Sequence, residues 1–195
     1  MLMKVTDANS VTVFDPRGVV ESANTPIAAR PKSLDGLRLA ILDNSKWNAN
    51  KVLRASTAAL EKSIKFGKVN YYVKGSFSKD AEPELIAEIA ANNDLVLTAI
   101  GDCGSCCSCC IRDSVALEKL GIPSAAIITT EFEKETVLTR TAIGMERLDS
   151  GGHRPPGQQH HPGGSRISRR PGRRDGAERL ARQVARLSSQ TWAPS

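Results

Sequence analysis

The sequence predicts an α/β protein with three layers, in which helices cover both faces of a mostly parallel sheet of four or five strands. Short apolar runs alternate along the chain with segments of helical periodicity, a pattern typical of βαβ units and of a sheet that is buried on both faces. The chain has 195 residues, of which 40% are hydrophobic, so it is long enough to bury one core. We therefore expect a single α/β domain with flanking segments.

The predicted strands are apolar runs that are too short for helices and are bounded by turn residues. They are Leu37–Leu42, Val69–Val73, Leu95–Ile100 and Ser124–Thr129. A further short strand is expected near Val11–Phe14, inside a polar lead-in that contains prolines.

The predicted helices lie between and after these strands. In the first, Val52, Ala55 and Ala59 recur at helical spacing, and Pro83 suits the first turn of the second. The four helices are expected at Asn48–Ser63, Glu84–Ala90, Asp113–Leu120 and Glu131–Ala142.

Composition divides the chain into a lead-in at residues 1–35, the α/β domain at residues 36–146, and a basic low-complexity tail at residues 147–195 that is predicted to be largely disordered. Residues 151–195 hold nine arginines and two acids, so they carry +7 and leave about −1 for the rest of a chain whose net charge is +6. Nucleic-acid binding is therefore not predicted from the overall charge. The tail resembles GC-rich coding sequence in a shifted frame, and our hypothesis is that a frameshift replaced the native C-terminus.

The sequence also predicts a cytoplasmic protein without a membrane partner. No segment approaches the roughly 18 apolar residues that span a bilayer, and the first residues lack the apolar core of a secretory signal. Thiols stay reduced in the cytoplasm, where clustered cysteines are more often redox, metal-binding or catalytic groups than a disulfide framework.

All five cysteines lie in the eight-residue run Cys103–Cys110. The run follows the predicted strand Leu95–Ile100 and precedes helical sequence, so we expect a strand, a glycine-containing turn and a helix. Thiols are then placed at a helix N-terminus, where unpaired N–H groups and the helix dipole favour thiolate. In this interpretation Cys103 is the attacking thiol, and Cys106, one turn inside the helix, is the resolving thiol.

Three other interpretations of the run remain open. If it is helical, Cys103, Cys106, Cys107 and Cys110 share one face, and four thiolates can hold zinc or an iron–sulfur cluster. The cysteines can instead be buried core residues. Cys106 and Arg112 also have the spacing of a cysteine-phosphatase loop, in which a helix N-terminus binds phosphate.

A second loop is expected to face the cysteine run. In open parallel sheets the ligand site lies beyond the carboxyl ends of the strands, which is where residues 43–48 and 102–110 follow the first and third buried strands. The alternative is structural: Asx turns at the start of the first loop and a helix cap at its end. The residues predicted to bind substrate are Asp43, Asn44, Lys46, Asn48, Gly104, Ser105 and Thr129.

The charged neighbours of the run have opposite expected effects. Asp102 directly precedes Cys103, and its negative charge opposes formation of a thiolate there. Arg112 is a cation that can offset this charge, and the alternative is that it is an ordinary surface arginine.

The segment Ile100-Gly-Asp-Cys103-Gly-Ser-Cys106, with Arg112–Pro123 after it, resembles the UGSC family, which is named for a selenocysteine-Gly-Ser-Cys motif. The loop Leu42–Asn50 is similar to the first-strand loop of that family. The resemblance covers about residues 35–130. It implies that Cys103 occupies the selenocysteine position, with Cys106 as its partner in redox chemistry. A more distant likeness is to the selenoprotein B subunit of glycine, sarcosine and betaine reductases.

These features predict a thiol-dependent oxidoreductase or transferase. Cys103 is expected to attack an electrophilic sulfur or activated carbon of a small-molecule substrate, and Cys106 to resolve the adduct as a disulfide. An external thiol reductant, supplied as such or by a reductase partner protein, then restores the thiols. The alternatives are a zinc- or iron–sulfur-binding module and a substrate-binding subunit of a larger reductase complex.

Overall fold

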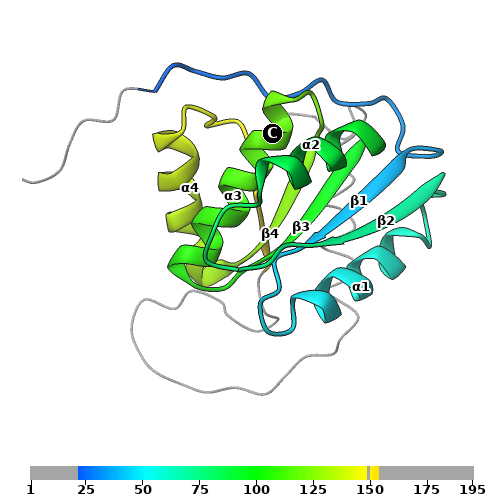
Figure 1. Ribbon diagram of the computed structural model, residues 1–195, viewed down its shortest axis with the longest axis horizontal. Coiled ribbons are helices and arrows are strands. Elements are labelled where there is room, and N and C mark those ends of the chain that lie inside the picture. Colours follow the sequence, from blue (N-terminus) through cyan, green and yellow to red (C-terminus); the bar gives the residue numbers. More distant parts are fainter. Residues whose placement is uncertain (1–21, 149, 154–195) are drawn as a thin grey trace, which may run out of the picture.

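A five-stranded sheet forms the centre of the computed structural model, which describes residues 22–148 and 150–153 (Figure 1). The strand order is β2-β1-β3-β4-β5, and every pairing is parallel. The strands are β1 (Arg38–Asp43), β2 (Lys68–Val73), β3 (Leu95–Gly101), β4 (Ser124–Thr129) and β5 (Ser150–His153). The helices are α1 (Ala49–Leu60), α2 (Pro83–Asn92), α3 (Gly104–Lys119) and α4 (Glu133–Ala142), with a 3-10 turn at Thr130–Phe132. The predicted α/β fold class is confirmed.

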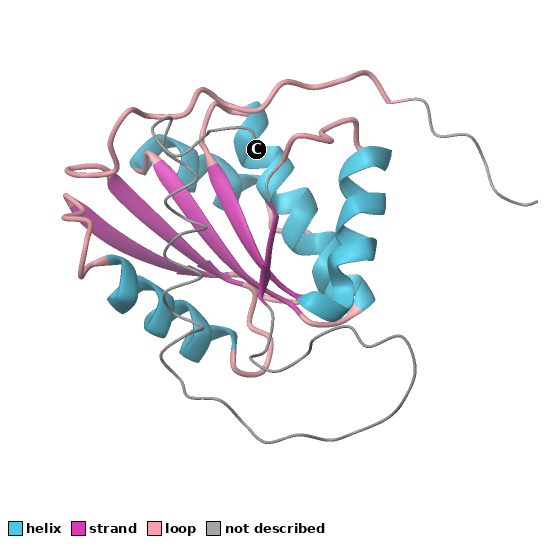
Figure 2. Cartoon of the chain, turned by 180° about the vertical axis from the view of Figure 1, so that it is seen from behind, coloured by secondary structure: helices cyan, strands magenta, loops and turns pink. Residues whose placement is uncertain are grey.

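Side chains alternate between the two faces of the sheet, as the two-residue period of a strand requires. On one face Leu39, Ile41 and their neighbours on β3 pack against Leu53 and Leu60 of α1. On the other face Ala40 and its neighbours pack against α2 and α3. Figures 1 and 2 show α1 alone on its side of the sheet and the other helices opposite. Helices therefore cover both faces, and strands buried on both sides appear in the sequence as continuous apolar runs.

The largest differences from the prediction are the start of the third helix and the presence of a strand after residue 146. The third helix begins at Gly104 instead of Asp113, because the cysteine run is itself helical and its buried thiols pack against the sheet. The fifth strand, Ser150–His153, lies beyond the predicted domain boundary at residue 146 and pairs with β4. Its sequence, Ser-Gly-Gly-His, has no apolar signal, and the pairing uses backbone groups alone. The predicted strand near Val11–Phe14 and the tail from residue 154 lie outside the described residues.

The lead-in contributes to the packing of the domain. Glu118 of α3 is buried, and its carboxylate accepts hydrogen bonds from the amides of Ala28 and Ser124, both at 2.7 Å. Arg30 Nη1 lies 2.9 Å from the same carboxylate. A buried carboxylate needs such partners because desolvation of a charge is costly. Residues 28–30 are thereby held against α3 and β4.

The strand order reverses between β1 and β3. From β1 the chain moves outward to β2, and it then returns to β3 on the other side of β1. Connections that leave neighbouring strands on opposite faces open a crevice beyond their carboxyl ends, where open α/β sheets bind ligands. The two loops that we expected to face each other follow these two strands. Among the described residues, no helix is both long and apolar enough to cross a bilayer.

Candidate active site

Cys103 is the N-cap of α3, as predicted from its position after β3. Its backbone is extended, and its Sγ accepts a hydrogen bond from the amide of Cys106 at 3.4 Å. No acidic residue lies in the first turn of α3, so the positive end of the helix dipole is free to act on this sulfur. The half-buried Cys103 side chain lies at the surface end of an otherwise buried run.

Cys103 and Cys106 are joined by a disulfide, with their Cα atoms 5.4 Å apart. This separation is within the ordinary range for disulfides, about 4.4–6.8 Å. One helical turn brings residues i and i+3 to the same face, and this geometry suits a pair that forms and breaks a bond without movement of the backbone. The two residues predicted to be catalytic are therefore in direct covalent contact.

Lys46 is the cation beside this pair. Its Nζ lies 3.6 Å from Cys103 Sγ and also 3.6 Å from Asp102 Oδ1. The ammonium group stands 4.5 Å from the centre of the Phe77 ring, and the Lys46 side chain is 22% exposed. A positive charge at this distance favours the thiolate over the thiol.

Asp102 contacts the second thiol of the pair. Its Oδ1 lies 3.3 Å from Cys106 Sγ, so this carboxylate is shared between Cys106 and Lys46. The expectation that Arg112 offsets Asp102 is wrong, because Arg112 Nε lies 2.8 Å from Asp80 and its Nη2 lies 3.4 Å from Cys109 Sγ. Lys46 takes that role. The phosphatase-like arrangement gains no support either, since Arg112 is bound to Asp80 and Cys106 to Cys103.

The loop that carries Lys46 is held by two Asx turns. Asp43 Oδ1 accepts from the amide of Ser45 at 2.8 Å, and Asn44 Oδ1 accepts from the amide of Lys46 at 3.2 Å. Asn44 also donates to the carbonyl of Ile100 at 3.0 Å, which ties the loop to the end of β3. Asn44 is fully buried, and its bonds fix the position of the loop that carries Lys46.

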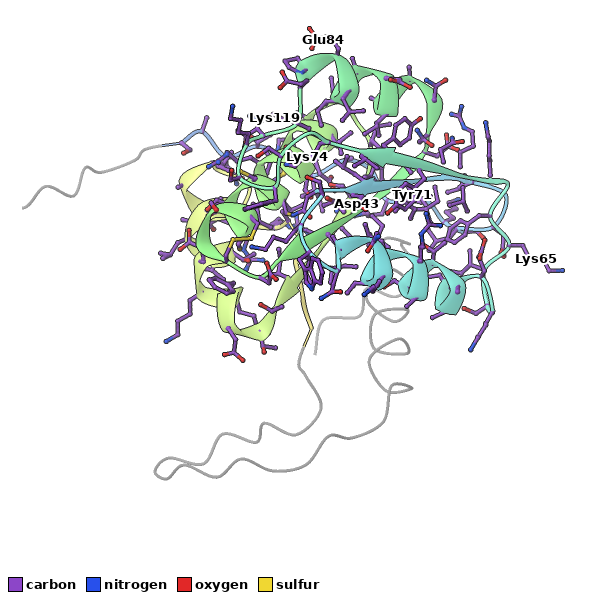
Figure 3. All side chains as sticks on the ribbon, turned by 60° about the horizontal axis from the view of Figure 1, so that its bottom comes forward. Asp43, Lys65, Tyr71, Lys74, Glu84 and Lys119 are labelled. Carbon is purple, nitrogen blue, oxygen red and sulfur yellow. A yellow bond between two sulfur atoms is a disulfide. The ribbon has the colours of Figure 1, made fainter. Side chains whose placement is uncertain are left out.

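The carboxylate of Asp43 is held from the edge strand. Tyr71 of β2 donates its hydroxyl hydrogen to Asp43 Oδ2 (Figure 3). Burial, followed by this bond to Asp43, raises the pKa of Tyr71 to about 12, so the phenol stays protonated and remains a donor at neutral pH. The guanidinium group of Arg54 lies over the Tyr71 ring, 4.8 Å from the centre of the ring. Both carboxylate oxygens of Asp43 are therefore engaged.

A pocket of about 320 Å³ lies beside this loop and the start of α1. Three predicted substrate-binding residues line it, namely Asp43, Lys46 and Asn48. Asn48 is the N-cap of α1 in a left-handed conformation, and its side chain makes no capping bond. The remaining lining residues are Ser45, Trp47, Asn50 and Lys51.

Two other predicted substrate-binding residues, Gly104 and Ser105, lie at the disulfide and not in the pocket. Gly104 and Ser105 are exposed in the first turn of α3, and Ser105 Oγ lies 3.6 Å from Cys103 Sγ. Thr129 ends β4 at the same edge of the sheet and donates to the carbonyl of Gly101 at 3.3 Å. Gly104 and Ser105 thus border the disulfide, whereas Thr129 braces the end of β3, the strand that precedes it.

The three remaining cysteines are free and buried. The pKa of each of these three thiols is raised, mainly by burial, and the pKa of Cys110 is raised to about 12. Cys107 Sγ lies 3.0 Å from Thr136 Oγ1 of α4. These thiols are core residues, as one of the open interpretations had it, and they are poorly ionised at neutral pH.

The predicted four-thiolate metal set is not brought together. Within residues 22–148 and 150–153, the group whose ligand atoms come within 4.8 Å of one another consists of Asp102, Cys103 and Cys106. Any ion at this edge of the sheet has one carboxylate and two thiolates available, and Cys107 and Cys110 lie deeper in the core.

Sequence reasoning missed a buried ion pair that supports the site. Lys74, labelled in Figure 3, forms a close pair with Asp113, and the side-chain exposures are 3% and 1%. Asp113 also accepts from the amide of Ala81 at 2.7 Å, and Lys74 Nζ donates to the carbonyl of Lys79 at 2.8 Å. The pair holds the loop after β2 against α3, and this loop carries Phe77. A lysine after a strand has no sequence signal that separates it from an ordinary surface lysine.

Gly101 was also missed, although it sets how closely α3 starts against the sheet. A Cβ at this position meets the side chain of Ile128 and comes within 3.0 Å of Cys107 Cα. Only glycine lets the end of β3 pass this near to the first turn of α3, and the path of the chain into Cys103 depends on it.

Comparison with known proteins finds one family. The model of the UGSC family matches residues 12–166, a wider span than the resemblance in the sequence suggested, and it includes part of the predicted tail. No curated protein matches the chain, and the distant likeness to the selenoprotein B subunit gains no support from these comparisons. The frameshift hypothesis stays a prediction. Because the match covers well over half of the chain and includes the Cys-Gly-Ser-Cys motif, the protein belongs to the UGSC family.

Proposed function

We propose that the protein is a thiol-dependent oxidoreductase or transferase in which Cys103 is the nucleophile and Cys106 the resolving thiol. The observation that carries this proposal is the position of Cys103 at the N-terminus of α3, in a disulfide with Cys106 and 3.6 Å from Lys46 Nζ. A helix N-terminus and a cation both stabilise a thiolate, and thiolate is the reactive form of cysteine.

The reaction with a disulfide substrate transfers two electrons from the protein. The Cys103 thiolate attacks one sulfur of the substrate, a mixed disulfide forms, and the substrate's own S–S bond breaks to release a first thiolate. Cys106, deprotonated, then attacks Cys103 Sγ, and the second substrate thiolate leaves. Both released thiolates take up protons from solvent. The protein ends as the Cys103–Cys106 disulfide, and the substrate ends as two thiols.

Asp102 is suited to assist the second step. Its Oδ1 lies 3.3 Å from Cys106 Sγ, which is within reach to accept the proton that Cys106 must lose before it attacks. Lys46 bridges Asp102 and Cys103, so one cation neutralises the carboxylate and stabilises the first thiolate. A return to the dithiol requires an external thiol reductant, or a reductase partner protein that supplies one.

A cytoplasmic location is part of the proposal, because a thiol pool there regenerates the reduced pair. Cytoplasmic disulfides are in most cases transient and catalytic. A disulfide between the N-cap of α3 and the first turn of the same helix, at the surface end of the cysteine run, agrees with such a role. The buried Cys107, Cys109 and Cys110 take no part in this cycle, since burial raises the pKa of each thiol.

Trapping of the mixed disulfide tests the proposal. Reduced Cys106→Ser protein treated with 2-hydroxyethyl disulfide is expected to gain one mercaptoethanol group on Cys103, because no resolving thiol is present to release it. The wild-type protein is expected to end with a Cys103–Cys106 disulfide, and Cys103→Ser with neither product. Adducts found mainly on Cys107, Cys109 or Cys110 contradict the assignment. A turnover that appears only after a partner protein is added favours the substrate-binding subunit of a larger reductase.

The group of Asp102, Cys103 and Cys106 favours a second candidate, a metal-binding module. Zinc accepts carboxylate and thiolate ligands, but the ammonium of Lys46 beside two of these ligands opposes a cation. Metal analysis of protein purified without oxygen separates the two candidates. Stoichiometric zinc or iron together with thiols blocked to alkylation favours the metal module, and reactive thiols without metal favour the redox enzyme.

A further inference from the structure

The pocket beside the disulfide holds a lysine that has no ion-pair partner within residues 22–148 and 150–153, and we infer from it that the substrates of this site are small organic anions. The inference rests on the proposed function, because it assigns a substrate class to the thiol chemistry of Cys103. Its support is the charge and shape of the pocket formed by the loop after β1 and the first turn of α1. At about 320 Å³ the pocket is within the range of small-molecule sites, roughly 300–1,000 Å³.

The lining holds two lysines and one acid. The acid, Asp43, keeps its negative charge, but both of its oxygens accept hydrogen bonds, from the amide of Ser45 and from the hydroxyl of Tyr71. Lys46 is paired with Asp102 and Cys103. Lys51, by contrast, is exposed and has no ion-pair partner among the described residues. Its ammonium is therefore available to an anion.

Trp47 provides an apolar wall next to this cation. Its side chain is 81% exposed, and the ammonium of Lys51 lies 5.9 Å from the centre of its ring. An exposed indole beside a lysine offers both a surface for a carbon skeleton and a charge for an acidic group. The amides of Asn48 and Asn50, which also line the pocket, add hydrogen-bonding groups for a carboxylate or similar anion.

Lys46 connects the pocket to the reactive sulfur. It lines the pocket, and its Nζ also lies 3.6 Å from Cys103 Sγ. A substrate whose anionic end lies near Lys51 can extend past Lys46 toward the Cys103 sulfur that Lys46 contacts. The pocket then binds the part of the substrate that does not react, and specificity for charge is separate from the chemistry at sulfur.

Three disulfides of similar length and opposite charge test this inference: the dianion dithiodiglycolate, the neutral 2-hydroxyethyl disulfide and the dication cystamine. Each is mixed with reduced protein at an ionic strength of about 20 mM, where screening is weak, and formation of the Cys103–Cys106 disulfide is followed over time. Wild-type protein is expected to react fastest with the dianion and slowest with the dication. The Lys51→Glu variant is expected to lower the dianion-to-dication rate ratio by roughly tenfold, the lower end of steering effects in charged clefts.

Lys65→Glu is the matched control. Lys65 is exposed and lies at the other end of the domain from Asp43 (Figure 3), so this variant makes the same change in net charge away from the pocket. Its rate ratio is expected to stay within about twofold of wild type, since the Debye length is roughly 20 Å at this ionic strength and Lys65 lies at the far end of the strands from the pocket. Equal effects of the two variants, or an equal rate with all three disulfides in wild type, overturn the inference.

Alkylation with neutral iodoacetamide separates failure of this inference from failure of the proposed function. Selective labelling of Cys103 in wild type and in Lys51→Glu shows that the thiol chemistry is intact. Equal reaction rates with the three disulfides then count against the anion site alone. Loss of selective labelling in the wild-type protein counts against the redox function itself.

Discussion

The ammonium of Lys46 lies 3.6 Å from the sulfur of Cys103, although 57 positions separate the two residues in the chain. The contact exists because β1 and β3 are neighbours in the sheet and their following loops meet beyond its edge. Cys103 therefore experiences two sources of positive potential, the N-terminus of α3 and the ammonium of Lys46. The first two predictions follow from this contact.

Replacement of Lys46 by methionine is expected to raise the pKa of Cys103. A cation at this distance favours the charged form of an acidic group, and the partial exposure of Lys46 weakens this effect without removing it. The rate of iodoacetamide alkylation of Cys103 against pH measures this pKa, and the midpoint should move upward. Lys46→Arg keeps the charge and is the control. A midpoint unchanged in Lys46→Met removes Lys46 from the mechanism.

Selective alkylation should distinguish Cys103 from the buried cysteines. In the native, reduced protein Cys103 is expected to react with iodoacetamide well below pH 8. Burial raises the pKa of Cys107, Cys109 and Cys110, so each is less ionised than a free thiol at any given pH, and each is shielded as well. Mass spectrometry of the labelled run checks this, and equal labelling of all five cysteines contradicts it.

The ion pair of Lys74 and Asp113 should be important for stability. Lys74→Met leaves a buried carboxylate without its cation and is expected to cost about 3–5 kcal/mol in the free energy of unfolding. Lys79→Met, an exposed change in the same loop, should cost little. Urea denaturation at pH 7 measures both variants, and similar values for the two contradict the assignment.

The loss in Lys74→Met should also depend on pH. Burial raises the pKa of Asp113, and removal of Lys74 raises it further, so the folded state holds this proton more tightly than the unfolded state. Stability from this group therefore falls as pH rises from the unfolded pKa through the raised folded pKa. Lys74→Met should lose less stability at pH 5 than at pH 7, relative to wild type at the same pH.

Gly101 and Gly104 offer a matched pair of substitutions around the motif. Gly101→Ala forces a methyl group against Ile128 and Cys107, and overpacking of this kind costs about 1–3 kcal/mol. A Cβ at Gly104 has no heavy atom within 4 Å, so Gly104→Ala in the first turn of α3 should be neutral or stabilising by up to about 1 kcal/mol. Equal destabilisation by both changes contradicts the close approach of β3 and α3.

Much of this structure follows from local pattern in the sequence. The apolar runs gave the first four strands, because strands that are buried on both faces need continuous hydrophobic sequence. The position of Cys103 between such a run and a helix predicted its place at the helix N-terminus. The spacing of Cys103 and Cys106 also predicted that one turn brings their sulfurs together.

The fifth strand was not predictable in the same way. Ser150–His153 pairs through its backbone beside β4, and a Gly-Gly sequence carries no sign of that pairing. The cysteine run is helical because its thiols pack into the core beneath β4, a tertiary contact that outweighs the weak helix propensity of cysteine.

By itself, the sequence determined which residues form the candidate site: two cysteines one helical turn apart and a polar loop after the first strand. The tertiary structure alone decided which charges act on them. In the folded chain Lys46 lies beside Cys103, Arg112 forms an ion pair with Asp80, and Lys74 forms a buried ion pair with Asp113. The physical reason is that helical spacing is a local property. The electrostatic environment of a sulfur depends instead on groups that are far apart in the sequence, and only the crossover connections between strands bring these groups within a few ångströms.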